Sequence, residues 1–158
     1  MRRLTLSLFV VMLIAAVASL GVAASAHTFK AYLMGKEDVP AVKTTARGEA
    51  LFKLEKGGTE LAYDLRIKDI ENVTAAHIHF GKKGENGAPV VNLYTGPKKE
   101  GKFSGDLVKG MITEKDLYGK LQGKKIEDVV KMIKAGELYV NVHTDKHPDG
   151  EIRGQIKS

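Results

Sequence analysis

The chain has 158 residues, a formal net charge of +6 at pH 7 and no cysteine. The lack of cysteine excludes disulfide bonds, thiol catalysis, iron–sulfur clusters and thiolate zinc sites, so any metal site must use His, Asp, Glu or backbone groups. The lysines occur in scattered pairs rather than along one stripe, which predicts a solvated surface and no nucleic-acid partner.

The first residues have the pattern of a secretory signal peptide. Arg2 and Arg3 precede an uncharged apolar run over residues 4–22, and the segment Ala24-Ser25-Ala26 supplies the small residues that a signal peptidase recognises. We predict cleavage after Ala26 and a secreted or periplasmic location. The alternative is an uncleaved anchor, the only membrane contact expected, because the run is nearly long enough to span a bilayer. Cleavage leaves residues 27–158 as one domain with net charge +4, since the leader removes two arginines from +6.

The remaining chain consists of short alternating segments separated by turns. Residues 37–42 form an irregular extended stretch, because Pro40 cannot donate to a strand ladder. Turns are predicted at residues 56–59, in the glycine-rich loop 81–87 and at 146–150. The predicted strands are 29–34, 49–55, 61–67, 74–80, 89–94, 102–112, 138–143 and 151–156.

One helix is predicted late in the chain. Ile126, Val129, Val130 and Ile133 form a single apolar stripe, and Gly136 is a natural C-terminal stop. A shorter helical turn is expected after Thr113. We therefore predict a mainly β protein: an antiparallel β-sandwich or barrel with one or two short helices.

Histidines are the residues with the clearest chemical potential. His77 and His79 are two residues apart, so on a strand both point to the same side. If Ile78 and Val142 face the core, then His77, His79 and His143 all face outward, and they converge on the outer wall of the barrel if their strands are neighbours. Three imidazoles suit copper or zinc and leave a fourth position open.

Several alternatives for the histidines stay open. His147 and Asp145 follow His143 closely and are candidate accessory ligands or supports of the ligands. The imidazoles can instead form hydrogen bonds that only fasten two strands together. Cleavage after Ala26 would also make His27 the N-terminal residue, which can chelate copper through its amine and ring, although a frayed terminus is the simpler expectation.

Other familiar sites are not indicated. The glycine-rich loop 81–87 lacks the Gly-Lys-Ser/Thr ending and the following helix of a phosphate loop. The acids of residues 145–151 lack EF-hand spacing. Ser104 has no evident base partner, so nothing indicates a serine hydrolase and no catalytic residue is assigned.

Five segments carry a resemblance to a known family. The residues concerned are 33–40, 74–79, 90–93, 139–144 and 150–156. Together they resemble the CHRD domain, first described in chordin and found alone in exported bacterial proteins. The resemblance implies an immunoglobulin-like β-barrel, distantly similar to copper–zinc superoxide dismutase, and a domain that binds other molecules.

The dismutase similarity is limited to one part of that enzyme's site. His77, His79 and His143 match the three copper ligands outside the bridging position, and Arg153 loosely matches the arginine that guides superoxide. The zinc-binding loop, the bridging histidine and the disulfide have no counterpart here. Three hypotheses follow: a module that binds an extracytoplasmic protein or surface polymer, a copper or zinc protein, and a redox enzyme of the dismutase kind.

Overall fold

A computed structural model describes residues 28–158, so the predicted signal peptide and His27 lie outside the described residues. The domain is mainly β, as predicted, with one α-helix. The strands are β1 (Thr28–Met34), β2 (Arg47–Glu55), β3 (Glu60–Phe80), β4 (Pro89–Tyr94), β5 (Lys99–Ile112), β6 (Leu138–Thr144) and β7 (Ile152–Gln155), and the helix is α1 (Ile126–Lys134).

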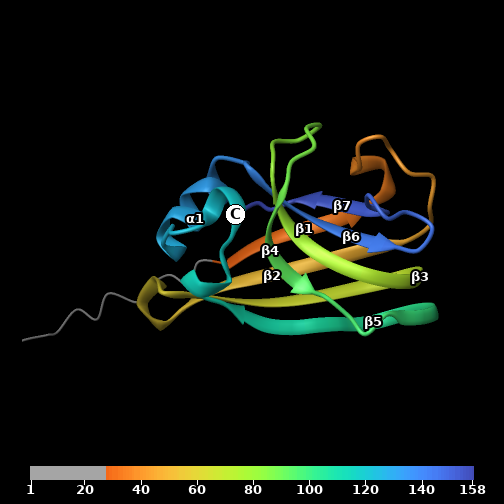
Figure 1. Cartoon of the computed structure of the whole chain (residues 1–158), viewed down its shortest axis with the longest axis horizontal. Helices are drawn as coiled ribbons and strands as arrows, with labels where there is room; N and C mark the ends of the chain where they lie inside the picture. The colour runs from red at the N-terminus through yellow and green to blue at the C-terminus, as the bar shows by residue number, and fades with distance from the viewer. Residues whose placement is uncertain (1–27) are drawn as a thin grey trace, which may run out of the picture.

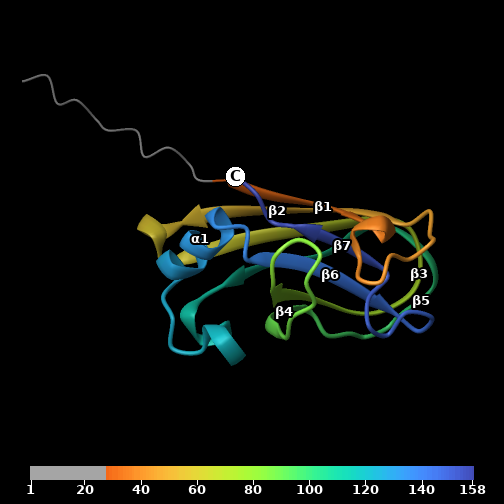
Figure 2. The same cartoon turned by 90° about the horizontal axis from the view of Figure 1, so that it is seen from above.

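Five antiparallel strands close into a barrel, which decides between the sandwich and the barrel expected from the sequence. β1 pairs with β2 and β7, β6 pairs with β7 and β3, and β3 pairs with β2, so the ring closes. β4 and β5 add to the barrel along β3. Figures 1 and 2 show α1 and the β2–β3 turn at one end, with the segment after β1 at the other.

The longest strand corrects the sequence analysis, which expected two strands over residues 61–67 and 74–80. β3 continues through the intervening residues, because Asp69 and Asn72 take positive φ values of 55° and 52° and let the strand bend without leaving the ladder with β5. Its first half pairs with β2 and β5, and its second half with β4 and β6. The bend therefore brings residues 73–80 beside β6.

The core lies inside the barrel and under α1. Inward side chains such as Phe52, Leu65, Ile78 and Val140 are almost fully buried. α1 buries the predicted stripe, and Gly136, with φ of 70°, follows the helix as expected of a C-terminal stop. The helical turn after Thr113 is a 3₁₀ turn over Glu114–Asp116.

Within residues 28–158, no helix combines the length and the hydropathy needed to cross a bilayer.

Candidate metal centre

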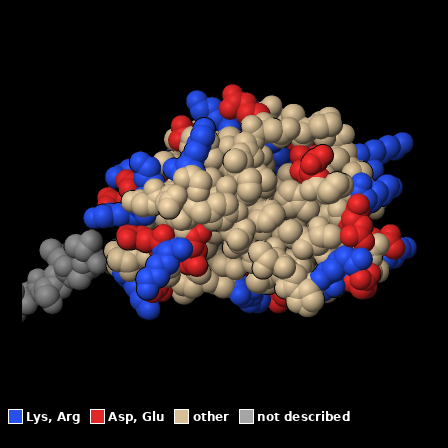
Figure 3. Space-filling view, in the orientation of Figure 1, with Lys and Arg blue, Asp and Glu red and all other residues tan. Residues whose placement is uncertain are grey.

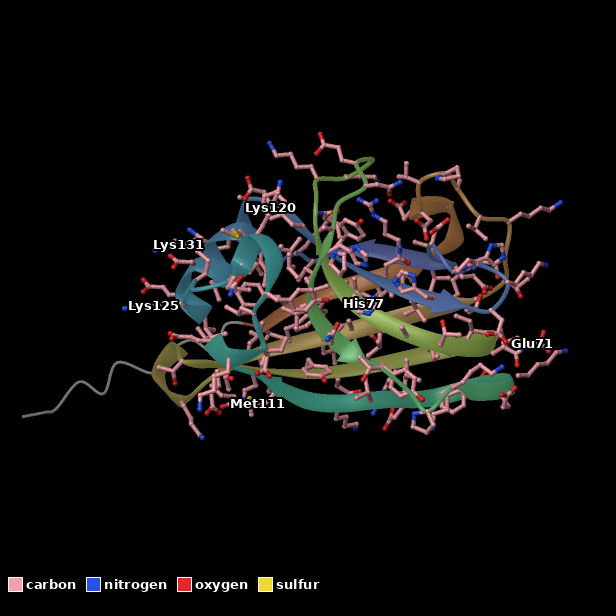
Figure 4. All side chains as sticks on the ribbon, in the orientation of Figure 1. Glu71, His77, Met111, Lys120, Lys125 and Lys131 are labelled. Atoms are coloured by element: carbon pink, nitrogen blue, oxygen red, sulfur yellow. The ribbon has the colours of Figure 1, made fainter. Side chains whose placement is uncertain are left out.

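Two neighbouring strands bring three histidines together on the outer face of the barrel. In the β3–β6 ladder Ala75 pairs with His143 and His77 pairs with Asn141, so His77 and His143 are diagonal neighbours. His79 follows two residues after His77 on the same face of β3. The predicted convergence is therefore confirmed. In Figure 4 His77 lies near the middle of the molecule, well away from Lys125 and Lys131 at the α1 end.

The three imidazoles are close enough to share one ion. One ring nitrogen from each of His77, His79 and His143 lies within 4.8 Å of the other two. His77 Nδ1 and His143 Nε2 are 3.1 Å apart. Two nitrogens bound tetrahedrally to zinc at about 2.1 Å are about 3.4 Å apart, so this pair is already near ligand spacing.

The sequence analysis did not foresee that the histidine face is covered. His79 and His143 keep only 7% and 8% of their surface exposed, whereas outward residues of a barrel wall are ordinarily solvated. Every residue of β6 is buried, on both faces of the strand. The cover includes the loop over residues 81–88, which is joined to the segment after β1 by a bond from Asn86 Nδ2 to the carbonyl oxygen of Val39.

Backbone acceptors fix the tautomers of two histidines. His79 Nδ1 donates to the carbonyl oxygen of Gly87 at 2.9 Å, and His143 Nδ1 donates to that of Pro148 at 2.9 Å. The Nε2 atoms of both rings are therefore unprotonated. His79 Nε2 is buried and has no hydrogen-bond partner among the described residues, so its lone pair is free to bind an ion.

His77 completes the set through its Nδ1 atom. Without an ion, His77 Nδ1 donates to the unprotonated His143 Nε2. The alternative tautomer of His77 carries its proton on Nε2 and leaves the Nδ1 lone pair directed toward the other two rings. An ion would therefore replace one hydrogen bond with three nitrogen ligands.

Burial keeps the three imidazoles neutral at pH 7. The pKa of His77 is lowered to about 4, mainly by burial and also by the neighbouring His143 and His79. Burial also lowers the pKa of His79, opposed by its bond to Gly87, and that of His143, opposed by its bond to Pro148. Neutral imidazoles have free lone pairs, so an ion need not displace protons from the site.

A three-layer stack holds the His79 ring in place. The Tyr139 ring stacks on His79 with centroids 5.0 Å apart and 15° between the planes, and Arg153 Cζ lies 3.5 Å from the other face of Tyr139. The same loop binds all three side chains. Gly87 N donates to the Tyr139 hydroxyl at 3.1 Å, and Arg153 Nη2 donates to the carbonyl oxygen of Lys82 at 2.8 Å.

The predicted accessory residues lie farther out. His147 is not part of the three-histidine group and lines a separate cavity of about 870 Å³. Asp145 lies at the edge of the histidine site, where it forms an ion pair with Lys98 at 2.9 Å. The described geometry thus joins neither residue to His77, His79 and His143.

An open cavity of about 690 Å³ leads to the three histidines. Its apolar wall includes Val39, Pro40 and Pro148, and its only charged lining residues among those described are Asp145 and Asp149. Figure 3, in the orientation of Figure 1, shows charged side chains of both signs mostly around the periphery and uncharged side chains over the centre. The charged groups of the cavity therefore favour a cation.

Sequence reasoning missed Asp38, Tyr139 and Asn141, which surround the histidines, and named Arg153 only as a loose match to the arginine that guides superoxide. All four are buried. A signal for their burial exists, because β6 spans seven residues without a charge in a chain of which 28% is charged. Such a strand is typical of one covered on both faces. No comparable local signal marks Asp38, which lies in an irregular segment.

Comparison with known proteins gives one match. The sequence model of the CHRD domain matches residues 29–156, which is most of the chain. No curated protein and no solved structure matches.

Proposed function

This chain belongs to the CHRD domain family, and we propose that it is an extracytoplasmic binding module whose ligand is one copper or zinc ion. The family suggests a binding role, and the leader pattern of residues 1–26 supports export. The ligand is argued from the site itself.

One observation carries the proposal: three neutral imidazoles converge, and the lone pair of a buried ring nitrogen has no partner. His79 Nε2 lacks any donor, and His143 Nε2 and His77 Nδ1 face each other at 3.1 Å. A set of histidines that only fastened strands would satisfy its buried nitrogens within the protein. Three nitrogens and an open fourth position fit zinc or copper.

Redox chemistry of the dismutase kind is less well supported than ion binding. Superoxide is an anion, and the charged side chains at the cavity are the acids Asp145 and Asp149. The guanidinium of Arg153 stacks on the Tyr139 ring and donates to the carbonyl oxygen of Lys82, so it is engaged within the protein rather than directed at the cavity. We therefore propose storage or delivery of the ion, and copper-loaded protein should dismute superoxide no faster than the same amount of free copper.

A macromolecular partner is compatible with the same site. The exposed cavity wall around Pro40 and Pro148 offers apolar contact to an extracytoplasmic protein or a surface polymer that reaches the ion. Retention of a partner by the metal-loaded protein, and its loss in the chelated protein, would support this form of the proposal. Retention that is indifferent to metal would separate partner binding from the histidine site.

The test is a calorimetric titration of residues 27–158 with zinc and with copper. All proteins carry His27→Ser, which removes a competing N-terminal chelate. Tight binding of one ion is expected, with loss of at least a hundredfold in affinity in the His77→Ala/His143→Ala variant. His147→Ala is the matched control, because His147 lies outside the group. Equal binding by all three proteins would refute the site.

A further inference from the structure

Several buried acceptor atoms on the covered face of the barrel have no hydrogen-bond partner among the described residues. Besides His79 Nε2, three buried side-chain oxygens in this layer have no partner: Asp38 Oδ2, Asn141 Oδ1 and Gln155 Oε1. Each of these atoms can accept hydrogen bonds and cannot donate one. An ion bound by the histidines would coordinate His79 Nε2, but the three oxygens would still lack a partner.

Two of the oxygens are directed at one place. Asp38 and Asn141 are 7% and 3% exposed. A Cβ atom at Gly150 would lie 2.3 Å from Asn141 Nδ2, 2.6 Å from Asn141 Oδ1 and 2.6 Å from Asp38 Oδ2, so the Asn141 amide and Asp38 Oδ2 both border the space above that glycine. The other oxygen of Asp38 already accepts from the backbone of Val39 at 2.8 Å. Asp38 Oδ2 is thus held in position without a donor.

This oxygen pair lies beside the histidines. Asn141 pairs with His77 across the ladder and is two residues from His143 on the same face of β6. Pro148, two residues before Gly150, accepts the hydrogen bond of His143. Burial is the main influence on the pKa of both His79 and His143, and the negative charge of Asp38 opposes its lowering effect in both.

A buried carboxylate that has no cation beside it, and one oxygen without a donor, is unfavourable, and a bound cation would stabilise it. Among the described residues, no Lys, Arg or His forms an ion pair with Asp38. A divalent ion at three neutral imidazoles brings two positive charges, and a water in its open position brings two hydrogen-bond donors. A monovalent ion brings half of that charge.

We propose that Asp38 and Asn141 form an oxygen subsite that makes the histidine centre select a divalent ion with a bound water over a monovalent ion. Asp38 supplies the negative charge, and Asn141 supplies a second acceptor for the water. Both are positioning residues that act through the ion and its water. This inference rests on the proposed function, because it requires an ion at the histidines.

The test compares Zn²⁺ and Ag⁺ affinities of residues 27–158, carrying His27→Ser, with those of the Asp38→Asn variant. Loss of a group that supports a metal site typically costs 10- to 100-fold in affinity. We expect Zn²⁺ binding to weaken at least tenfold and Ag⁺ binding less than threefold. Asp69→Asn is the matched control, because that acid is exposed and does not line the histidine cavity, and it should change neither affinity more than threefold.

A second readout separates selection from a structural role. Asn at position 38 keeps the acceptor for Val39 and gains an amide that can donate to Asn141 Oδ1, so the apo-variant should melt at or above the wild-type temperature. If Asp38→Asn does not fold, the near-isosteric Asn141→Leu decides, and it should weaken Zn²⁺ binding severalfold while sparing Ag⁺.

The outcomes are distinct. If the unsubstituted protein binds neither ion, the proposed function fails and the inference fails with it. If it binds Zn²⁺ but the ratio of Zn²⁺ to Ag⁺ affinity is unchanged in Asp38→Asn, only the inference fails. A lower apo melting temperature with equal loss of both ions would make Asp38 a structural residue.

Discussion

Acid is expected to destabilise the metal-free domain through the buried histidines. The pKa of His77 is about 4 in the folded protein, against about 6.5 when the chain is unfolded. The unfolded chain therefore binds the proton first as pH falls. The contribution of His77 to stability is complete above about pH 7, declines as pH falls through 6.5 toward 4, and is absent below that value.

The size of the effect follows from the same difference. A change from about 6.5 to about 4 corresponds to about 3.4 kcal/mol at most. His77 is only partly buried, and solvent screening reduces this to about 1–2 kcal/mol. His79 and His143 have lowered pKa values too and act in the same direction.

Urea unfolding with a chelator present, at pH 7.5, 6.5, 5.5 and 4.5, measures this effect. As pH falls over this range, the free energy of unfolding should decrease by about 1–2 kcal/mol more in wild type than in His77→Gln. Carboxylates titrate equally in both proteins, so they cancel in the comparison. His147→Gln, outside the group, should follow wild type. Identical pH dependence in wild type and His77→Gln would refute the assignment of buried, neutral imidazoles.

Two further predictions concern the scaffold. Gly87→Ala places a Cβ atom 1.5 Å from the carbonyl oxygen of Phe80, so it should lower the unfolding free energy by at least about 2 kcal/mol. It should also weaken zinc binding, because the Gly87 carbonyl that accepts from His79 is displaced. Gly84→Ala meets open space at φ of 82°, so it should cost about 1 kcal/mol and leave zinc affinity unchanged. Ile78→Ala leaves a cavity at a fully buried position and should lower the free energy of unfolding, measured in urea, by about 3 kcal/mol. Lys68→Ala, at an exposed position of β3, should change it by no more than about 0.5 kcal/mol. Equal losses within either pair of variants would contradict the placement of these residues.

The sequence predicts the histidine side of the site well, for a physical reason. Strand side chains alternate with a period of two, so Ile78 and Val142, which must be buried, put the histidines of both strands on the opposite face. Periodicity does not determine which strands are neighbours. The pairing of Ala75 with His143 joins residues far apart in the chain and depends on the closed barrel.

The remainder of the site depends on tertiary structure. Asp38 lies in an irregular segment where no period fixes its direction, and its burial results from the loops that cover the barrel wall. The continuity of β3 does not follow from the sequence, because Asp and Asn are common in turns and positive φ at Asp69 and Asn72 is compatible with a turn or with a bend in one strand. Pairing with β5 selects the bend.

Crystals of the zinc-loaded domain, measured at the zinc absorption edge, test the central claim most directly. One strong anomalous peak is expected at about 2.1 Å from His79 Nε2, His143 Nε2 and His77 Nδ1. Full zinc occupancy elsewhere, for example at His147, with no peak among the three histidines, would contradict it.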